Sequence, residues 1–317
     1  MRRLPALLTA AALATVLASS LTACSGVPGF GGCEPAYQPG DASELVTATG
    51  AFGSAPDVDF PTPLIVDGAP QTSVLIEGEG DPTPQGGTVD FDFSLWDGQS
   101  GQTYGATDYA EQPGGRLVAN DSTSVTKSLQ CTRVGERFAL TTRAEDAYAE
   151  GSIPEGLEPD TTLVFVVDVI ATYLGKADGI NQLQQDGMPT VVTAPDGKPG
   201  ITVPATEAPD ELRVSTVKAG GHETVEDGDS VVVHFSSFTW PAPGDIVNEV
   251  DSSWPRKPIN VTVDEGATAS ASQGVPPVAA AQLVGTKVGS QVLVVIPPDD
   301  QSGDTVIVVI DVLGIQK

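Results

Sequence analysis

The stretch Leu283–Pro298, LVGTKVGSQVLVVIPP, decides the fold of this chain. It joins an apolar turn to a Val-Gly pair, and a run of β-branched residues follows at once, which is typical of a turn that enters a buried strand. The earlier stretch Leu129–Arg143, LQCTRVGERFALTTR, has the same skeleton, with Thr three residues after the Leu and Val-Gly two residues after the Thr. Two copies of one pattern predict an internal repeat.

Strand-like runs flank both copies, and helical patterns are scarce. The strand-like runs are Val89–Phe93, Thr162–Ile170, Val231–Phe235 and Thr305–Leu313. The best helix candidates, Ser124–Gln130 and Val278–Val284, stand at matching places in the copies and are too short to be stable alone. Each therefore has to pack its apolar side on a sheet. The sequence predicts an α+β fold with two domains, each a curved antiparallel sheet with one short helix.

Composition supports two domains and excludes some partners. A chain of 317 residues suits two domains better than one, and 35 Gly with 26 Pro favour strands and turns. The 15 basic and 42 acidic residues give a formal net charge of −27. Nucleic acid and anionic membrane surfaces carry the same sign of charge and would repel such a chain. We therefore expect no nucleic-acid partner, and we expect a monomer.

A basic segment, an apolar segment and a small-residue segment open the chain in that order. Arg2 and Arg3 precede the apolar segment Leu4–Leu21, and the sequence Leu-Thr-Ala-Cys ends at Cys24. This order resembles a bacterial lipoprotein signal, which implies cleavage before Cys24 and a lipid anchor on that residue. The resemblance implies a protein on the extracytoplasmic face of the cell membrane. An uncleaved transmembrane helix is the alternative, because the apolar segment is nearly long enough to span a bilayer.

Two further cysteines, Cys33 and Cys131, remain beside the lipidated one. Outside the cytoplasm such a pair is expected to oxidise. We predict a disulfide that fastens the N-terminal arm to the first domain, and two free thiols are the alternative. The expected divisions of the chain are a signal peptide over 1–23, a flexible tether over 24–40, a first domain over 41–174, a linker over 175–187 and a second domain over 188–317.

The second copy carries a series of short motifs along its length. They are Gly228-Asp229, Val232-Val233-His234-Phe235, Asp251-Ser252-Ser253, Lys257-Pro258, Val288-Gly289, Ile296-Pro297-Pro298 and Thr305–Leu313. From Val217 to the C-terminus this series resembles the FKBP-type peptidyl-prolyl isomerases, and the first copy resembles the same family at fewer positions. The resemblance implies an enzyme that isomerises X–Pro bonds of exported polypeptides.

The chemistry that the resemblance implies requires no cofactor. Rotation about an X–Pro amide has a barrier of about 20 kcal/mol, which comes mainly from lost amide resonance. An apolar, aromatic cup lowers the barrier by removing water from the amide, whose planar form is more polar than its twisted form. Such a mechanism uses neither a nucleophile nor a metal. The only histidines, His222 and His234, accordingly form no nucleophilic or metal-ligand pattern.

The resemblance also assigns the residues of each cup. In the second copy the catalytic set is Phe235, Asp251, Val275 and Pro276, and the substrate-binding set is Val250, Ile259, Ala279 and Val308. In the first copy the substrate-binding set is Phe93, Tyr104, Tyr148 and Phe165. The second copy thus keeps the acidic residue but few rings, whereas the first keeps rings and has Gly105 at the acidic position. Pro276 lacks the backbone N–H with which the family holds a ligand carbonyl.

We therefore expect a lipid-anchored, extracytoplasmic prolyl isomerase or chaperone whose partners are proline-containing exported polypeptides. The alternative is a peptide-binding lipoprotein of the same fold with weak or no catalysis. Two structural alternatives also remain open. Phe93, Phe165 and Phe235 would then be ordinary core residues, and Asp251 would be a turn residue. A calcium loop over Asp299–Asp304 is disfavoured by its spacing, and a solute-binding protein by the lack of alternating β–α units.

Overall fold

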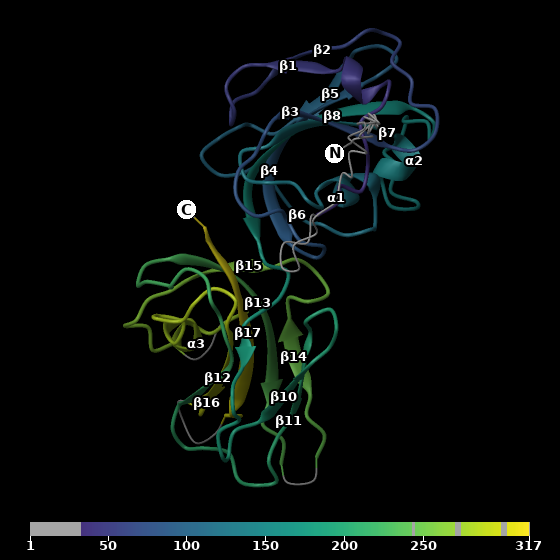
Figure 1. Ribbon diagram of the computed structural model, residues 1–317. Coiled ribbons are helices and arrows are strands. Elements are labelled where there is room, and N and C mark those ends of the chain that lie inside the picture. The colour runs from purple at the N-terminus through teal and green to yellow at the C-terminus, as the bar shows by residue number, and fades with distance from the viewer. Residues whose placement is uncertain (1–32, 243–244, 270–273, 299–302, 317) are drawn as a thin grey trace, which may run out of the picture. The chain divides into compact units, whose positions relative to one another are not determined.

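The computed structural model describes residues 33–242, 245–269, 274–298 and 303–316 (Figure 1). The first half contains η1 (Ser43–Leu45), β1 (Thr47–Thr49), β2 (Asp57–Asp59), β3 (Gln71–Ile76), β4 (Thr88–Asp97), β5 (Thr103–Ala106), β6 (Gly115–Val118), α1 (Ser124–Ser128), β7 (Arg137–Arg143), α2 (Ala144–Ala147) and β8 (Thr162–Tyr173). The second half contains β9 (Ile180–Asn181), β10 (Thr190–Thr193), β11 (Pro199–Thr202), β12 (Arg213–Ala219), β13 (Ser230–Thr239), β14 (Glu249–Ser252), β15 (Ile259–Thr262), α3 (Pro277–Ala281), β16 (Gln291–Ile296) and β17 (Val306–Gln316). Antiparallel strands with a few short helices confirm the predicted α+β class.

Two large sheets share one strand order. The first sheet has the order β3–β7–β8–β4–β5, and β6 also pairs with β4. The second has the order β12–β16–β17–β13–β14, with β15 also paired to β13 and β9 added beside β12. The two orders match strand for strand, and every pairing is antiparallel. This match is the structural form of the repeat that the sequence predicts.

The Val-Gly pair has the same role in both sheets. Gly135 and Gly289 have φ values of 84° and 92°, a backbone conformation that glycine adopts without steric cost. The N–H of Gly135 donates to the carbonyl of Val169 over 2.9 Å, and that of Gly289 donates to the carbonyl of Val312 over 2.8 Å. The turn therefore places the start of β7 beside β8 and the start of β16 beside β17.

Each sheet packs on both faces, which we call the helix side and the hairpin side. On the helix side, Leu129 near α1 and Leu283 near α3 join the apolar side chains of the strands. On the hairpin side, Val58 of the β1–β2 hairpin and Ile201 of the β10–β11 hairpin pack against the opposite face of their sheets. Apolar area removed from water on both faces is the main stabilising contribution to each half.

A buried polar pair marks the same place in both sheets. In the first, the guanidinium of Arg137 donates to both carboxylate oxygens of Asp168 over 2.5 and 2.7 Å, and both side chains are fully buried. In the second, the matching residues are Gln291 and Asp311, where the amide donates to the carboxylate over 2.7 Å. Each carboxylate also accepts one backbone N–H from the hairpin side, from Gly53 over 2.9 Å and from Ala177 over 2.8 Å.

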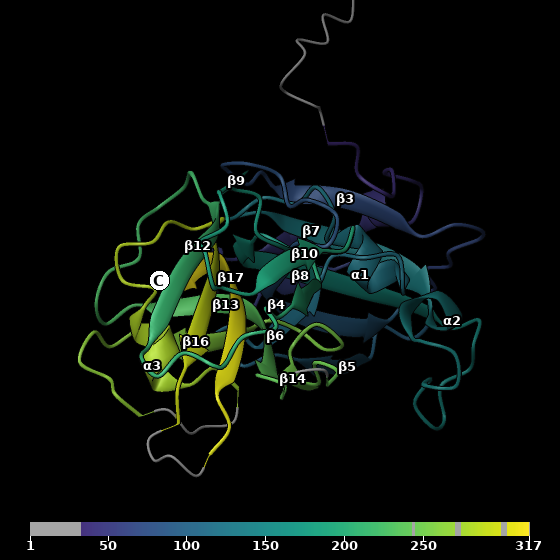
Figure 2. The same cartoon turned by 90° about the horizontal axis from the view of Figure 1, so that it is seen from below.

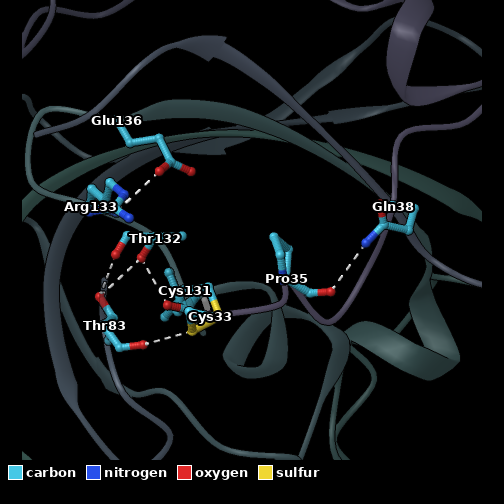
Figure 3. The surroundings of a disulfide bond; sticks show 9 residues. Cys33, Pro35, Gln38, Thr83, Cys131, Thr132, Arg133 and Glu136 are labelled. Carbon is cyan, nitrogen blue, oxygen red and sulfur yellow. Dashed lines mark hydrogen bonds between the residues drawn. A yellow bond between two sulfur atoms is a disulfide. The ribbon is translucent and has the colours of Figure 1, made fainter. Parts of the chain in front are cut away.

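Cys33 and Cys131 form a disulfide, the pairing that the sequence predicts, with 5.5 Å between their Cα atoms (Figure 3). Cys131 has a φ of 68°, and its N–H donates to the carbonyl of Thr83 over 2.9 Å. The hydroxyl of Thr83 in turn donates to the carbonyl of Thr132 over 2.9 Å. The bond fastens the start of the described chain to the segment between α1 and β7.

The segment predicted as a linker is bonded to the second sheet over its first residues. Besides the Ala177 contact, the N–H of Gly179 donates to the carbonyl of Gly289 over 2.9 Å, and β9 pairs with the end of β12. The five-part division of the chain nevertheless stays a prediction.

The proposed signal peptide and Cys24 lie outside the described residues, so the lipid anchor also stays a prediction. Within the described part of the chain, no helix has the length and apolar character needed to cross a membrane.

Candidate functional site

Strand register equates the cup positions of the two halves. In the second half, Ser237 of β13 lies opposite Val308 of β17 on one side and Asp251 of β14 on the other. In the first half, Leu95 of β4 lies opposite Phe165 and Gly105 in the same way. Phe93 and Phe235 each stand two residues earlier on their strands. Phe93 therefore matches Phe235 in position, Phe165 matches Val308, and Gly105 matches Asp251.

The second cup is assembled but closed. Phe235, Val275, Ala279 and Val308 lie in one core cluster, with Ile259 packed against it. Phe235 is 1% exposed, and Ala279 and Val308 are fully buried. A ligand that stacked on the Phe235 ring would have to displace this packing. Val250 does not join the cluster and is 64% exposed.

Asp251 lies at the edge of this closed cup and is engaged locally. Its carboxylate accepts the N–H of Ser252 over 2.8 Å and a guanidinium N–H of Arg256 over 3.2 Å. The side chain is 40% exposed, which leaves it in reach of solvent. The acidic residue of the second cup is therefore available at the surface, while the ring of Phe235 is not.

The Ser-Ser pair after Asp251 ties β14 to β13. The N–H of Phe235 donates to the hydroxyl of Ser253 over 2.9 Å, and a 2.8 Å hydrogen bond joins that hydroxyl to Nδ1 of His234. The imidazole of His234 also stacks on Trp254, with 4.2 Å between ring centroids. Burial lowers the pKa of His234 to about 4, so the ring is neutral near pH 7. These contacts position Phe235 and give the motif a structural role.

The position that should hold a ligand carbonyl offers no free N–H in either half. Pro276 stands directly before α3 and has no N–H, and its carbonyl accepts the N–H groups of Ala279 and Ala280. The matching residue before α1 is Thr123, whose N–H donates to the hydroxyl of Thr126 over 3.0 Å in a capping box. A substrate carbonyl would have to break that cap to be held there.

The first cup keeps its rings in partial contact with solvent. The ring centroids of Phe93 and Phe165 lie 6.2 Å apart and those of Phe91 and Phe93 lie 6.1 Å apart, both in tilted arrangements. Phe93 and Tyr148 are half-buried against the core cluster, and Tyr104 is 46% exposed. The rings therefore form an aromatic surface with a buried floor and an accessible rim.

Tyr104 is held in place at this rim. Its hydroxyl donates to the carboxylate of Asp97 over 2.8 Å. Partial burial and this hydrogen bond raise the pKa of Tyr104, so it stays a neutral donor. By register it takes the place of Val250, the exposed residue of the second half. Phe91 was not assigned from the sequence, although its spacing of two residues from Phe93 puts both rings on one face of β4.

A hollow among the described residues lies away from both cups. It has a volume of about 680 Å³ and lies at the ends of β8 and β17, where Tyr173 and Leu313 line it. None of the assigned cup residues lines this hollow. The candidate site is therefore defined by the geometry of its rings rather than by the size of a cavity.

Known proteins resemble this chain in structure. No protein-family model and no curated protein sequence matches the chain. Among solved structures, the three FKBP domains of wheat FKBP73 match with a TM-score of 0.32 and 17% identity, over 79% of this chain and 96% of that one. The chain is similar in structure to FKBP-type proteins. The N-terminal domain of Arabidopsis thaliana FKBP42 matches with a TM-score of 0.30 and 22% identity, over 37% of this chain and 96% of that one. A Pseudomonas syringae peptidyl-prolyl cis-trans isomerase matches with a TM-score of 0.28 and 23% identity, over 32% of this chain and 74% of that one.

Proposed function

We propose that this chain is a lipid-anchored, extracytoplasmic prolyl isomerase that binds proline-containing segments of exported polypeptides in the cup of its first half. The observation that carries the proposal is the aromatic surface of Phe93 and Phe165, with Tyr104 and Tyr148 accessible at its rim. A proline ring is apolar and packs on aromatic faces, and its X–Pro amide loses water when it does so. The closed second cup offers no such surface.

Desolvation is the source of the acceleration in this proposal. Each 1.36 kcal/mol removed from the barrier raises the isomerisation rate about tenfold. A hydrogen bond to the substrate carbonyl would add roughly 1 kcal/mol of positioning. Because the N–H of Thr123 is committed to its cap and Pro276 has none, we expect catalysis without that contribution. The activity should therefore be measurable but modest.

The decisive experiment measures the refolding of a substrate protein whose folding is limited by a cis–trans proline step. The protein beginning at Ser25 should accelerate the slow phase. Tyr104→Ala should reduce the acceleration, and Tyr104→Phe should preserve it, because the ring and not the hydroxyl covers the proline. Val250→Ala, at the matching exposed place in the second half, is the control and should change nothing. Equal losses from Val250→Ala and Tyr104→Ala would refute the assignment to the first cup.

A second candidate function is peptide binding without catalysis, favoured by the committed or missing donors at Thr123 and Pro276. It predicts that the protein suppresses aggregation of a proline-rich unfolded polypeptide and leaves the slow refolding phase unchanged. Asp251→Ala separates the two halves in the same assay. A loss of acceleration in that variant would assign the activity to the second half, as the family resemblance suggests.

The anchor is tested separately from the activity. The pattern that ends at Cys24 supports lipidation of that residue. Cys24→Ala should move the protein from the membrane fraction to the soluble fraction and abolish labelling by a fatty-acid probe. Membrane retention of the unlabelled variant would instead support the uncleaved transmembrane helix.

A further inference from the structure

The outer edges of the two sheets are built alike but covered differently. The edge strands are β3 in the first sheet and β12 in the second, and the register equates Thr72 with Val214, Ser73 with Ser215 and Val74 with Thr216. Both strands carry a register shift at the same place, after Val74 and after Thr216. The two edges can therefore be compared residue by residue.

In the first half, the chain's own N-terminal arm covers this edge. The N–H of Thr72 donates to the carbonyl of Gln38 over 3.2 Å, and its hydroxyl donates to the carbonyl of Tyr37 over 2.9 Å. The hydroxyl of Ser73 is hydrogen-bonded to that of Ser43 over 2.8 Å. Part of the chain itself thus already occupies the edge of β3.

In the second half, the matching part of the edge is open. On its outer side β12 pairs with β9 through Lys218 and Ala219, and the carbonyl of Val217 accepts the N–H of Gln182 over 2.8 Å (Figure 2). Among the described residues, the N–H of Val214 donates to no group outside the sheet, whereas Thr72 at the same place donates to the arm. Beyond Gln182, no backbone hydrogen bond among the described residues joins the segment that follows β9 to β12, and the side chain of Arg213 donates to the carbonyl of Asp186 in that segment over 3.0 Å.

A groove runs along this open edge. It has a volume of about 520 Å³, and it is lined by Ser215–Lys218 of β12, Leu293 of β16, Asn181–Gln184, Pro189–Val191 and Thr193. The described residues that line it include no Asp or Glu, although the chain has 42 of them. Leu183, which lines the groove, is 93% exposed, and Ile180 beside the groove is 78% exposed. Unpaired strand edges with apolar neighbours are places where another strand adds.

We propose that the edge of β12 is a second polypeptide-binding site, which takes an uncharged extended segment of a partner polypeptide as an added β-strand. The backbone of that segment pairs with the open edge of β12, starting at the N–H of Val214. Its apolar side chains contact Leu183 and Ile180, and its uncharged polar side chains meet the amides of Asn181, Gln182 and Gln184. The one cation among the described residues of the lining, Lys218, already donates to the carbonyl of Ala177 over 3.0 Å. The N-terminal arm on β3 is an example, within the same chain, of a polypeptide segment bound at this edge. This site does not depend on the aromatic cup and does not require proline.

The test uses the protein beginning at Ser25 and a fluorescein-labelled, proline-free decapeptide of alternating valine and threonine with a glutamine at each end. Fluorescence anisotropy should show binding, and hydrogen exchange should slow at the amide of Val214 when the peptide is present. Thr216→Lys places a charge on the open edge and should weaken binding on the order of tenfold. Val74→Lys, at the matching place on the covered edge, is the control and should leave the affinity unchanged.

Other outcomes would overturn the proposal. Equal weakening by Val74→Lys and Thr216→Lys would show that binding is not specific to the open edge. Unchanged exchange at Val214 in the saturated complex would place the peptide elsewhere. A dimer in light scattering that Thr216→Lys dissociates would make a second copy of this chain the occupant. Loss of binding in Tyr104→Ala would show that the probe uses the aromatic cup.

Discussion

Replacing Asp311 by Asn tests the buried carboxylate of the second sheet. Asp311 is 1% exposed, and its two oxygens accept the N–H of Ala177 and the amide of Gln291. Gln291 stands where the first sheet has the cation Arg137. Burial raises the pKa of Asp311 from its ordinary 3.8 to about 6, because hydrogen bonds from neutral donors only partly replace lost water.

The size and sign of the effect follow from this shift. A displacement of about 2 pKa units corresponds to roughly 3 kcal/mol, and the folded-state pKa lies above the unfolded one. The stability that protonated Asp311 contributes to the folded state is therefore fully present below pH 4, and it is lost as the pH rises through about 6. Asn has the same shape and stays neutral, and the amide of Gln291 turns to accept from it. We expect Asp311→Asn to be more stable than the parent protein by up to about 3 kcal/mol near pH 7.5, and equally stable near pH 4.

The assay is urea unfolding followed by tryptophan fluorescence across this pH range, with parent and variant measured side by side. Burial raises the pKa of Glu136 to about 6 and lowers the pKa of His234 to about 4, so both also titrate in this range. Both groups are present in the two proteins, and their contributions largely cancel in the difference. A variant that is less stable than the parent at pH 7.5, or a difference that does not shrink on acidification, would refute the reasoning.

Three further predictions concern the scaffold. Cys131→Ser opens the disulfide and should lower the free energy of unfolding by about 4–5 kcal/mol under non-reducing conditions, with no further loss when reductant is added. Asp168→Asn leaves the fully buried Arg137 without its carboxylate and should cost about 3–5 kcal/mol, so the same substitution that stabilises the second sheet destabilises the first. Gly314→Ala puts a Cβ 2.4 Å from the Tyr173 ring and should cost about 1–3 kcal/mol in thermal unfolding, whereas Gly221→Ala, which meets nothing within 4 Å, should be near neutral.

The strands and the repeat could be predicted from the sequence because their signals are local. The β-branched run after Gly289 becomes β16, fully buried throughout, and the run before the chain's end becomes β17. The helix candidates at matching places become α1 and α3. Alternation and turn residues are encoded within a few positions, so no distant contact is needed to read them.

The parts that escaped prediction depend on distant contacts. Ala177 was expected in a linker, yet its N–H donates to the carboxylate of Asp311, which lies far along the chain. The two hairpins leave only a weak signal in the sequence, because strands as short as β1 carry little periodic pattern. The buried carboxylate of Asp168 holds the β1–β2 hairpin, and both hairpins cover their sheets through apolar contacts that only the folded chain creates.

Small residues in the second cup indicate that it has lost ring volume, but these residues alone do not determine whether the cup is closed. Val308 of the second half stands where the first half has the ring of Phe165, and a smaller side chain at that place leaves either a cavity or a collapsed wall. The structure shows the collapsed wall, since Phe235 is 1% exposed. In the first half Phe165 keeps its ring at the place of Val308, and the ring of Phe93 remains partly accessible. Whether a cavity or a collapsed wall forms depends on how closely the short helix can approach its sheet, and the sequence does not specify that distance.

The two halves have diverged in opposite directions at two places where a sheet of this kind can meet another polypeptide. In the first half the cup keeps its rings, and the arm fills the edge of β3 through Gln38 and Ser43. In the second half the cup is closed around Phe235, and the edge of β12 is open at Val214. One chain would therefore offer a proline-binding cup and a strand-binding edge on different sheets. An extended polypeptide that engages both sites gains from effective concentration, so weak binding at each site is compatible with firm retention of a long unfolded chain and rapid release of a folded one.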